Sequence, residues 1–141
     1  MKKLIEILIF AFALAAFVSC EKEPDPIPEP PITLSKFIIG TWDEIPANPT
    51  KVSYYSVTFT GKYYSCSHTD EDGDTHYGDP ETYVVGDNEI VFTPTVIRNY
   101  KTGTLGSWPF GQVVVTWSES VPDQMTLTKL NGQPTLFNRK N

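Results

Sequence analysis

The sequence predicts an all-β domain of about eight or nine short strands, arranged as a small closed antiparallel meander barrel, with a β-sandwich as the alternative. No stretch beyond residue 36 keeps an apolar repeat of 3.6 residues, whereas β-branched and aromatic residues are frequent there. Turn signals separate apolar runs that follow each other closely, as in successive hairpins. Closing such a meander removes its exposed strand edges, which favours the barrel over the sandwich.

The individual strands follow from alternation and from the turns between them. The segment 52–59 alternates, which puts Tyr55, Val57 and Phe59 on one face. Gly86-Asp87-Asn88 is a compact hairpin turn between two further strands. The expected strands cover residues 37–45, 52–59, 62–69, 81–85, 89–93, 95–100, 112–118, 124–130 and 135–139.

Short motifs along these strands carry a family resemblance that covers residues 37–139. They are Gly40-Thr41-Trp42, Phe59-Thr60-Gly61-Lys62-Tyr63, Trp117 with Met125-Thr126-Leu127-Thr128, and Phe137-Asn138-Arg139. Together they resemble the signatures of the lipocalins and their bacterial lipocalin-like relatives. The resemblance implies that Trp42 packs across the closed end of a barrel and that Arg139 lies over its ring. The alternative is that Trp42 is an ordinary core tryptophan on a strand.

The N-terminus has the organisation of an export signal. Lys2 and Lys3 precede an apolar run at 7–18, and the small residue Ser19 stands before Cys20. Twelve apolar residues fit a signal peptide at 1–19 better than a membrane span, which needs roughly 20. Phe17-Val18-Ser19-Cys20 resembles the lipobox of bacterial lipoproteins. The resemblance implies that Cys20 becomes a lipidated N-terminal residue; a plain secreted protein and an uncleaved anchor are the alternatives.

A proline-rich acidic linker follows at residues 20–36, before a domain at 37–141. Prolines at 24, 26, 28, 30 and 31 exclude a helix or central strand and favour a stiff extended spacer. Acidic residues directly after Cys20 resemble the export signals of surface lipoproteins in some Gram-negative anaerobes. We therefore expect a lipid-anchored protein of the outer membrane, with the cell surface as the favoured side.

The charge of the chain excludes one class of partner. Removing residues 1–19 leaves 9 basic and 16 acidic residues, a formal charge of −7. Such an acidic domain is unsuited to nucleic acid, whose phosphates need a basic face. Attraction to anionic lipid headgroups is equally poor, so contact with the membrane is expected through lipidated Cys20 alone.

The segment 101–111 is the longest irregular stretch of the domain, and it suggests a ligand site. Trp108 and Phe110 lie there between glycines, with Arg98 and Tyr100 just before it. These aromatic rings could stack on a saccharide or cover an apolar ligand, while Arg98 could pair with a carboxylate. The alternative is that Trp108 and Phe110 fold back to fill the end of the barrel.

Metal and catalytic patterns are weak. Asp70, Asp72 and Asp74 match the first positions of a calcium loop and Glu81 the twelfth, but Thr75 replaces the required glycine, so a solvated hairpin turn is the favoured interpretation. Cys66 and His68 share a strand face without forming a recognised catalytic or zinc motif. We expect neither a metal site nor a cofactor.

Three classes of function remain, none of them enzymatic. The first is a lipid-anchored binder of a small apolar or saccharide ligand. The second is a protein-interaction module, such as an accessory subunit of an outer-membrane complex or an enzyme inhibitor. The third is a structural adhesin-type sandwich, which strand order would distinguish from a barrel.

Overall fold

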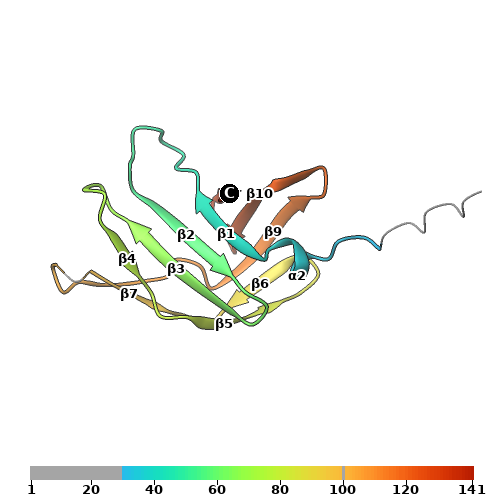
Figure 1. Ribbon diagram of the computed structural model, residues 1–141, viewed down its shortest axis with the longest axis horizontal. Helices are drawn as coiled ribbons and strands as arrows, with labels where there is room; N and C mark the ends of the chain where they lie inside the picture. Colours follow the sequence, from blue (N-terminus) through green and yellow to red (C-terminus); the bar gives the residue numbers. More distant parts are fainter. Residues whose placement is uncertain (1–29, 100) are drawn as a thin grey trace, which may run out of the picture. The chain divides into compact units, whose positions relative to one another are not determined.

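Nine antiparallel strands form one sheet, and eight of them close into a barrel because β2 pairs with both β1 and β3 (Figure 1). The computed structural model describes residues 30–99 and 101–141; the predicted signal peptide, Cys20, the linker up to residue 29 and Tyr100 lie outside the described residues. The barrel strands are β1 (Gly40–Glu44), β2 (Tyr54–Phe59), β3 (Tyr63–Thr69), β5 (Glu81–Val85), β6 (Glu89–Phe92), β9 (Gln112–Ser118), β10 (Val121–Lys129) and β11 (Pro134–Arg139).

The order of these strands around the barrel confirms the predicted meander. Each strand pairs with the next barrel strand along the chain, and β11 returns to β1 with Trp42 opposite Arg139. The sandwich alternative is wrong, because the sheet closes on itself instead of splitting into two packed layers.

Three short strands outside the barrel wall lie near its β3 side. β4 (Thr75–Tyr77) pairs with β3, and β7 (Val96–Arg98) pairs with β8 (Leu105–Ser107) in a separate hairpin. A bridge between Gly78 and Ile97 connects the two hairpins. The predicted strand at 95–100 is therefore real but shorter, and it leaves the barrel; Pro94, which has no amide hydrogen to donate, separates it from β6.

The segment before β1 is helical, which corrects the expectation of a strand from Phe37. Helix α2 (Leu34–Phe37) is held by hydrogen bonds from Lys36 N and Phe37 N to the carbonyl of Thr33, at 3.0 and 2.9 Å. Leu34 and Phe37 are buried. The compact unit accordingly begins at Pro31, so residues 31–36 belong to the barrel domain and not to the linker.

The closed end of the barrel consists of α2, Trp42 and Arg139. Trp42 is fully buried, and its Nε1 donates to the carbonyl of Ile38 at 2.7 Å. The Arg139 guanidinium lies 4.2 Å from the Trp42 ring centroid and donates to the carbonyls of Ile39 (2.6 Å) and Phe37 (2.7 Å). The expected arginine-over-tryptophan arrangement is thus confirmed.

Gly40 makes this arrangement possible. Its φ is +126°, a conformation that other residues rarely adopt, and a Cβ there would lie 2.9 Å from Arg139 Nη1. The Gly-x-Trp spacing therefore has a local cause: glycine turns the chain from α2 into β1 and leaves room for the guanidinium.

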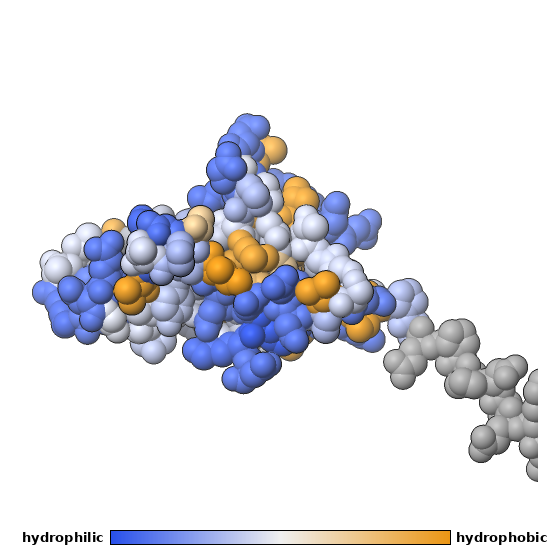
Figure 2. All heavy atoms as spheres, turned by 90° about the horizontal axis from the view of Figure 1, so that it is seen from above, coloured by the Kyte–Doolittle hydropathy of each residue, from blue (hydrophilic) through white to orange (hydrophobic). Residues whose placement is uncertain are grey.

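Side chains from all around the barrel fill its interior. As predicted, Val57 and Phe59 of β2 point inward and are buried, and Tyr55 packs against the same cluster. On the face shown in Figure 2, hydrophilic residues predominate and hydrophobic ones form small separate patches. Within the described part of the chain, no helix has the length and apolar character needed to cross a membrane.

Candidate functional site

The described members of the predicted ligand set do not converge on one surface. Trp108 and Phe110 are only 4% and 5% exposed and belong to the core. Trp108 packs edge-on against Tyr55, with ring centroids 5.6 Å apart, and Phe110 packs on Phe137. The alternative, in which both aromatics fill the barrel interior, therefore describes their positions. Arg98 is exposed on β7, and Tyr100 lies outside the described residues.

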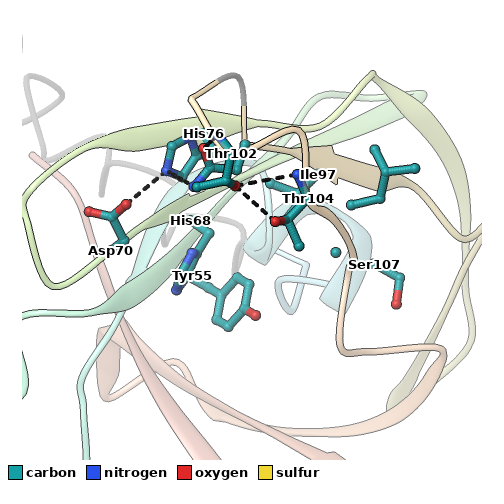
Figure 3. Close-up of a pocket in the computed structure, with 11 residues that line it drawn as sticks. Tyr55, His68, Asp70, His76, Ile97, Thr102, Thr104 and Ser107 are labelled. Atoms are coloured by element: carbon teal, nitrogen blue, oxygen red, sulfur yellow. Dashed lines mark hydrogen bonds and ion pairs between the residues drawn. The ribbon is translucent and has the colours of Figure 1, made fainter.

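A pocket opens beside the β7–β8 hairpin (Figure 3). We call it the hairpin pocket, because it lies among β2, β3, β4 and the β7–β8 hairpin; its volume is about 330 Å³. Figure 1 shows β4 and β7 at one end of the barrel and α2 at the other, so the pocket is remote from the closed end. It is lined by Tyr55, His68, Asp70, His76, Ile97, Asn99, Thr102, Thr104, Leu105, Gly106 and Ser107.

Strand alternation brings two histidines to this pocket. On β4 only His76 is buried, while its neighbours Thr75 and Tyr77 are exposed. His68 of β3 is the register partner of His76, so the two side chains share one face of the sheet. In the same way Ile97 and Gly106 are partners on the opposing hairpin. Register between short strands therefore creates the pocket.

Asp70 and His76 form the polar centre of the pocket. His76 Nε2 lies 2.9 Å from Asp70 Oδ2, and Figure 3 shows the two side chains directed toward each other. Asp70 Oδ1 also accepts from the backbone N–H groups of Asp72 (3.1 Å) and Asp74 (2.9 Å). The hydrogen bond from His76, supported by these amides, lowers the pKa of the Asp70 carboxyl below its usual value.

Asn99 lies next to the same ring nitrogen of His76 that contacts Asp70. Asn99 Oδ1 accepts from the backbone N–H groups of Lys101 and Thr102, so its amide nitrogen faces His76 Nε2 at 3.3 Å. Because the ionised Asp70 oxygen needs a donor, we assign the ring hydrogen of His76 to Nε2. In the neutral ring Nδ1 is then an acceptor.

Tyr55 and His68 make the aromatic wall. Their ring centroids are 4.7 Å apart, and His68 Nε2 lies 2.8 Å from Ser53 Oγ. The backbone N–H of Tyr55 donates to the Glu44 carboxylate at 2.9 Å. Burial, and secondarily Glu44, raise the pKa of the Tyr55 phenol, so Tyr55 offers a neutral ring and hydroxyl at physiological pH.

The residues of the calcium-loop pattern and Cys66 occupy positions in turns, strand ends and the core. Asp70, Asp72 and Asp74 belong to the tight β3–β4 turn, in which Asp74 pairs with Lys101, and Glu81 stands at the start of β5. Among residues 30–99 and 101–141, no three His, Cys, Asp or Glu side chains are grouped as metal ligands. Burial raises the pKa of the Cys66 thiol to about 12, which keeps it protonated and unreactive.

Most of the pocket residues were not among the sequence candidates. Tyr55 was placed on the inward face by its alternation, but nothing marked it as a ligand contact. His76 could not be placed, because a three-residue strand gives no periodic signal and the pairing of β3 with β4 depends on the turn between them.

Comparisons with protein-family models, with characterised proteins and with solved structures gave no match for this chain.

Proposed function

We propose that the protein is a lipid-anchored envelope lipoprotein of the outer membrane, whose lipocalin-like barrel binds a small ligand in the hairpin pocket without catalysing a reaction. The observation that carries the binding part is a preformed concave site with polar side chains already held in place. Its volume of about 330 Å³ falls at the lower end of the range for small-molecule sites, roughly 300–1,000 Å³.

The lining favours a ligand with two kinds of surface. Tyr55, Ile97 and Leu105 offer an aromatic and aliphatic wall, whereas the polar lining supplies fixed hydrogen-bonding groups. A compact molecule with an apolar face and several polar substituents fits this combination, as a saccharide or a substituted ring does. A purely apolar ligand would leave Asp70 and Asn99 without solvent, at a cost in binding free energy.

Filling the pocket tests the binding proposal. A side chain at Gly106 would point to the same face as its partner Ile97, and its Cβ would meet nothing closer than the Ile97 carbonyl oxygen at 3.9 Å. Gly106→Phe should therefore occupy the pocket with little strain. Gly61→Phe is the matched control, because Gly61 lies in the exposed β2–β3 turn with no atom within 4 Å of an added Cβ.

The measurement is a small-molecule screen by protein-observed NMR on the full chain. We expect hits that shift pocket resonances in the unmodified protein and in Gly61→Phe but not in Gly106→Phe. Hits that bind Gly106→Phe equally well would place the ligand elsewhere, and a screen without hits would count against a small-ligand role.

Metabolic labelling with palmitate tests the anchor. The apolar segment ending at Ser19-Cys20 supports lipidation of Cys20. Label should be lost in Cys20→Ala and retained in Cys66→Ala, since Cys66 is the other cysteine and is buried in the barrel. Unchanged incorporation in Cys20→Ala would refute the anchor. If the label is lost, protease treatment of intact cells reports whether the barrel domain is exposed on the cell surface.

A further inference from the structure

The hairpin pocket has an acidic electrostatic environment. Among its described lining residues, Asp70 is the only Asp or Glu, and no Lys or Arg lines it. The turn that carries Asp70 adds Glu71, Asp72 and Asp74 close by, and Glu44 contacts the Tyr55 backbone. In such a site a cationic group gains Coulomb energy, while an anionic one loses it.

The nearby basic residues do not cancel this field. Lys101 is paired with Asp74, and this contact, reinforced by Asp70 and Asp72, raises the pKa of the Lys101 ammonium. Arg98 follows Ile97 on β7, so it points to the opposite face and is exposed. Arg98 is thus directed away from the pocket lining, and Lys101 is held by Asp74 and is not among the lining residues.

Asp70 also keeps the capacity to bind a ligand. Its two oxygens offer about four acceptor positions. Two backbone amides and His76 occupy three of these positions, and the side chain remains 26% exposed. The contacts also hold the carboxylate in its ionised form and in one orientation, which lowers the entropic cost of binding a donor.

His76 is the buried partner of Asp70 in the pocket wall. It is a polar side chain only 6% exposed, lies in the pocket wall and is oriented by its hydrogen bond to Asp70. The contact of His76 Nε2 with Asp70 Oδ2 at 2.9 Å holds the carboxylate in the pocket wall, where one of its acceptor positions remains open. The site therefore presents an acceptor at its polar centre, opposite an apolar wall.

We propose that the ligand of the hairpin pocket is a small primary amine with a ring-shaped body, whose ammonium group binds Asp70. This inference rests on the proposed small-ligand function and specifies its ligand class. The ammonium donates to the free acceptor position of Asp70, and the ring lies against Tyr55 and Leu105. The hydroxyls of Thr102, Thr104 and Ser107 are available for polar substituents on the ring.

Three probes that share a phenethyl group test the charge requirement: phenethylamine, its N-acetyl amide and 3-phenylpropionate. Dissociation constants are measured by NMR titration of the full chain at low salt. We expect the amine to bind about tenfold tighter than the amide, and the carboxylate to bind weakest, because a charge-assisted hydrogen bond is roughly twice as strong as a neutral one. Added salt should reduce the difference in affinity between the amine and the other two probes, because it screens the charge of Asp70.

Asp70→Asn should reduce the affinity for the amine about tenfold and leave the affinity for the amide within about twofold. Asp72→Asn is the matched control, because it removes the same charge from the same turn at an exposed position outside the pocket lining. If Asp70→Asn fails to fold, the ranking of the three probes on the unmodified protein still decides the question.

The outcomes separate the two proposals. Equal binding of amine and amide, or tightest binding of the carboxylate, would overturn the amine inference while leaving a small-ligand function in place. If none of the three probes binds and the screen described above gives no hits, both the amine inference and the proposed small-ligand function are contradicted.

Discussion

The two ends of the barrel are built on opposite principles. At the closed end, one arginine and one tryptophan combine burial, stacking and hydrogen bonds to backbone carbonyls, and α2 covers them. At the other end, the hairpin pocket is bordered by three-residue strands and by polar side chains that hold each other. The difference indicates that the closed end stabilises the barrel, whereas the pocket end is free to serve recognition.

Removing the tryptophan of the closed end should have the largest effect. Trp42→Ala takes a fully buried indole out of the core and leaves Arg139 without its stacking partner. We expect a loss of about 3–5 kcal/mol in the free energy of unfolding, measured by urea denaturation. Trp117→Ala is the control: this half-buried indole packs on Phe37 and should cost clearly less. Equal losses would contradict a special role for Trp42.

Arg139→Leu should destabilise the fold by about 2 kcal/mol. The substitution keeps an apolar side chain over Trp42 but removes the cation–π contact and leaves the carbonyls of Phe37 and Ile39 without their donor. The neighbouring Lys140→Leu is the control, because its ammonium is exposed and 3.6 Å from Asp43, so its change should stay within about 0.5 kcal/mol. An Arg139 effect as small as that of Lys140 would remove the contrast between the two ends.

At the pocket end we expect a smaller effect that depends on pH. The pKa of Asp70 is lowered in the folded protein, so its ionised form contributes stability above the ordinary carboxyl pKa of about 3.9, and this contribution is lost as the pH falls through the lowered value. The difference in urea midpoint between the unmodified protein and Asp70→Asn should thus be largest near neutral pH and shrink below pH about 4. A difference that stays constant from neutral to acidic pH would show that the hydrogen bonds of ionised Asp70 add no stability.

The sequence predicted the barrel better than the pocket, for identifiable reasons. The segments 81–85 and 112–118 were predicted with the observed bounds, because turn residues flank alternating apolar residues. Gly40, Trp42 and Arg139 could be found because two short motifs mark them, Gly40-Thr41-Trp42 at the first strand and Phe137-Asn138-Arg139 at the last. The four-residue helix α2 shows no amphipathic period, so it was missed.

The pocket could not be predicted because it depends on pairing between segments. Its histidines meet only through the register of β3 with β4, and its opposing wall requires β7 to leave the barrel after Pro94. Both are tertiary outcomes that alternation within one strand does not contain. The loop at 101–111 was predicted to hold a ligand site through Trp108 and Phe110, but both rings are buried in the core, and other residues of the loop line the pocket.

The pairing of β1 with β11 has a consequence for how this chain acquires its structure. Arg139 donates to the carbonyl of Ile39 across a separation of 100 residues. The barrel therefore cannot close, and Arg139 cannot lie over Trp42, until β11 is present. Contacts this distant in sequence form slowly. For a protein exported from its N-terminus, as we propose, the barrel would thus stay open until β11 has crossed the membrane, and the fold itself would delay premature folding.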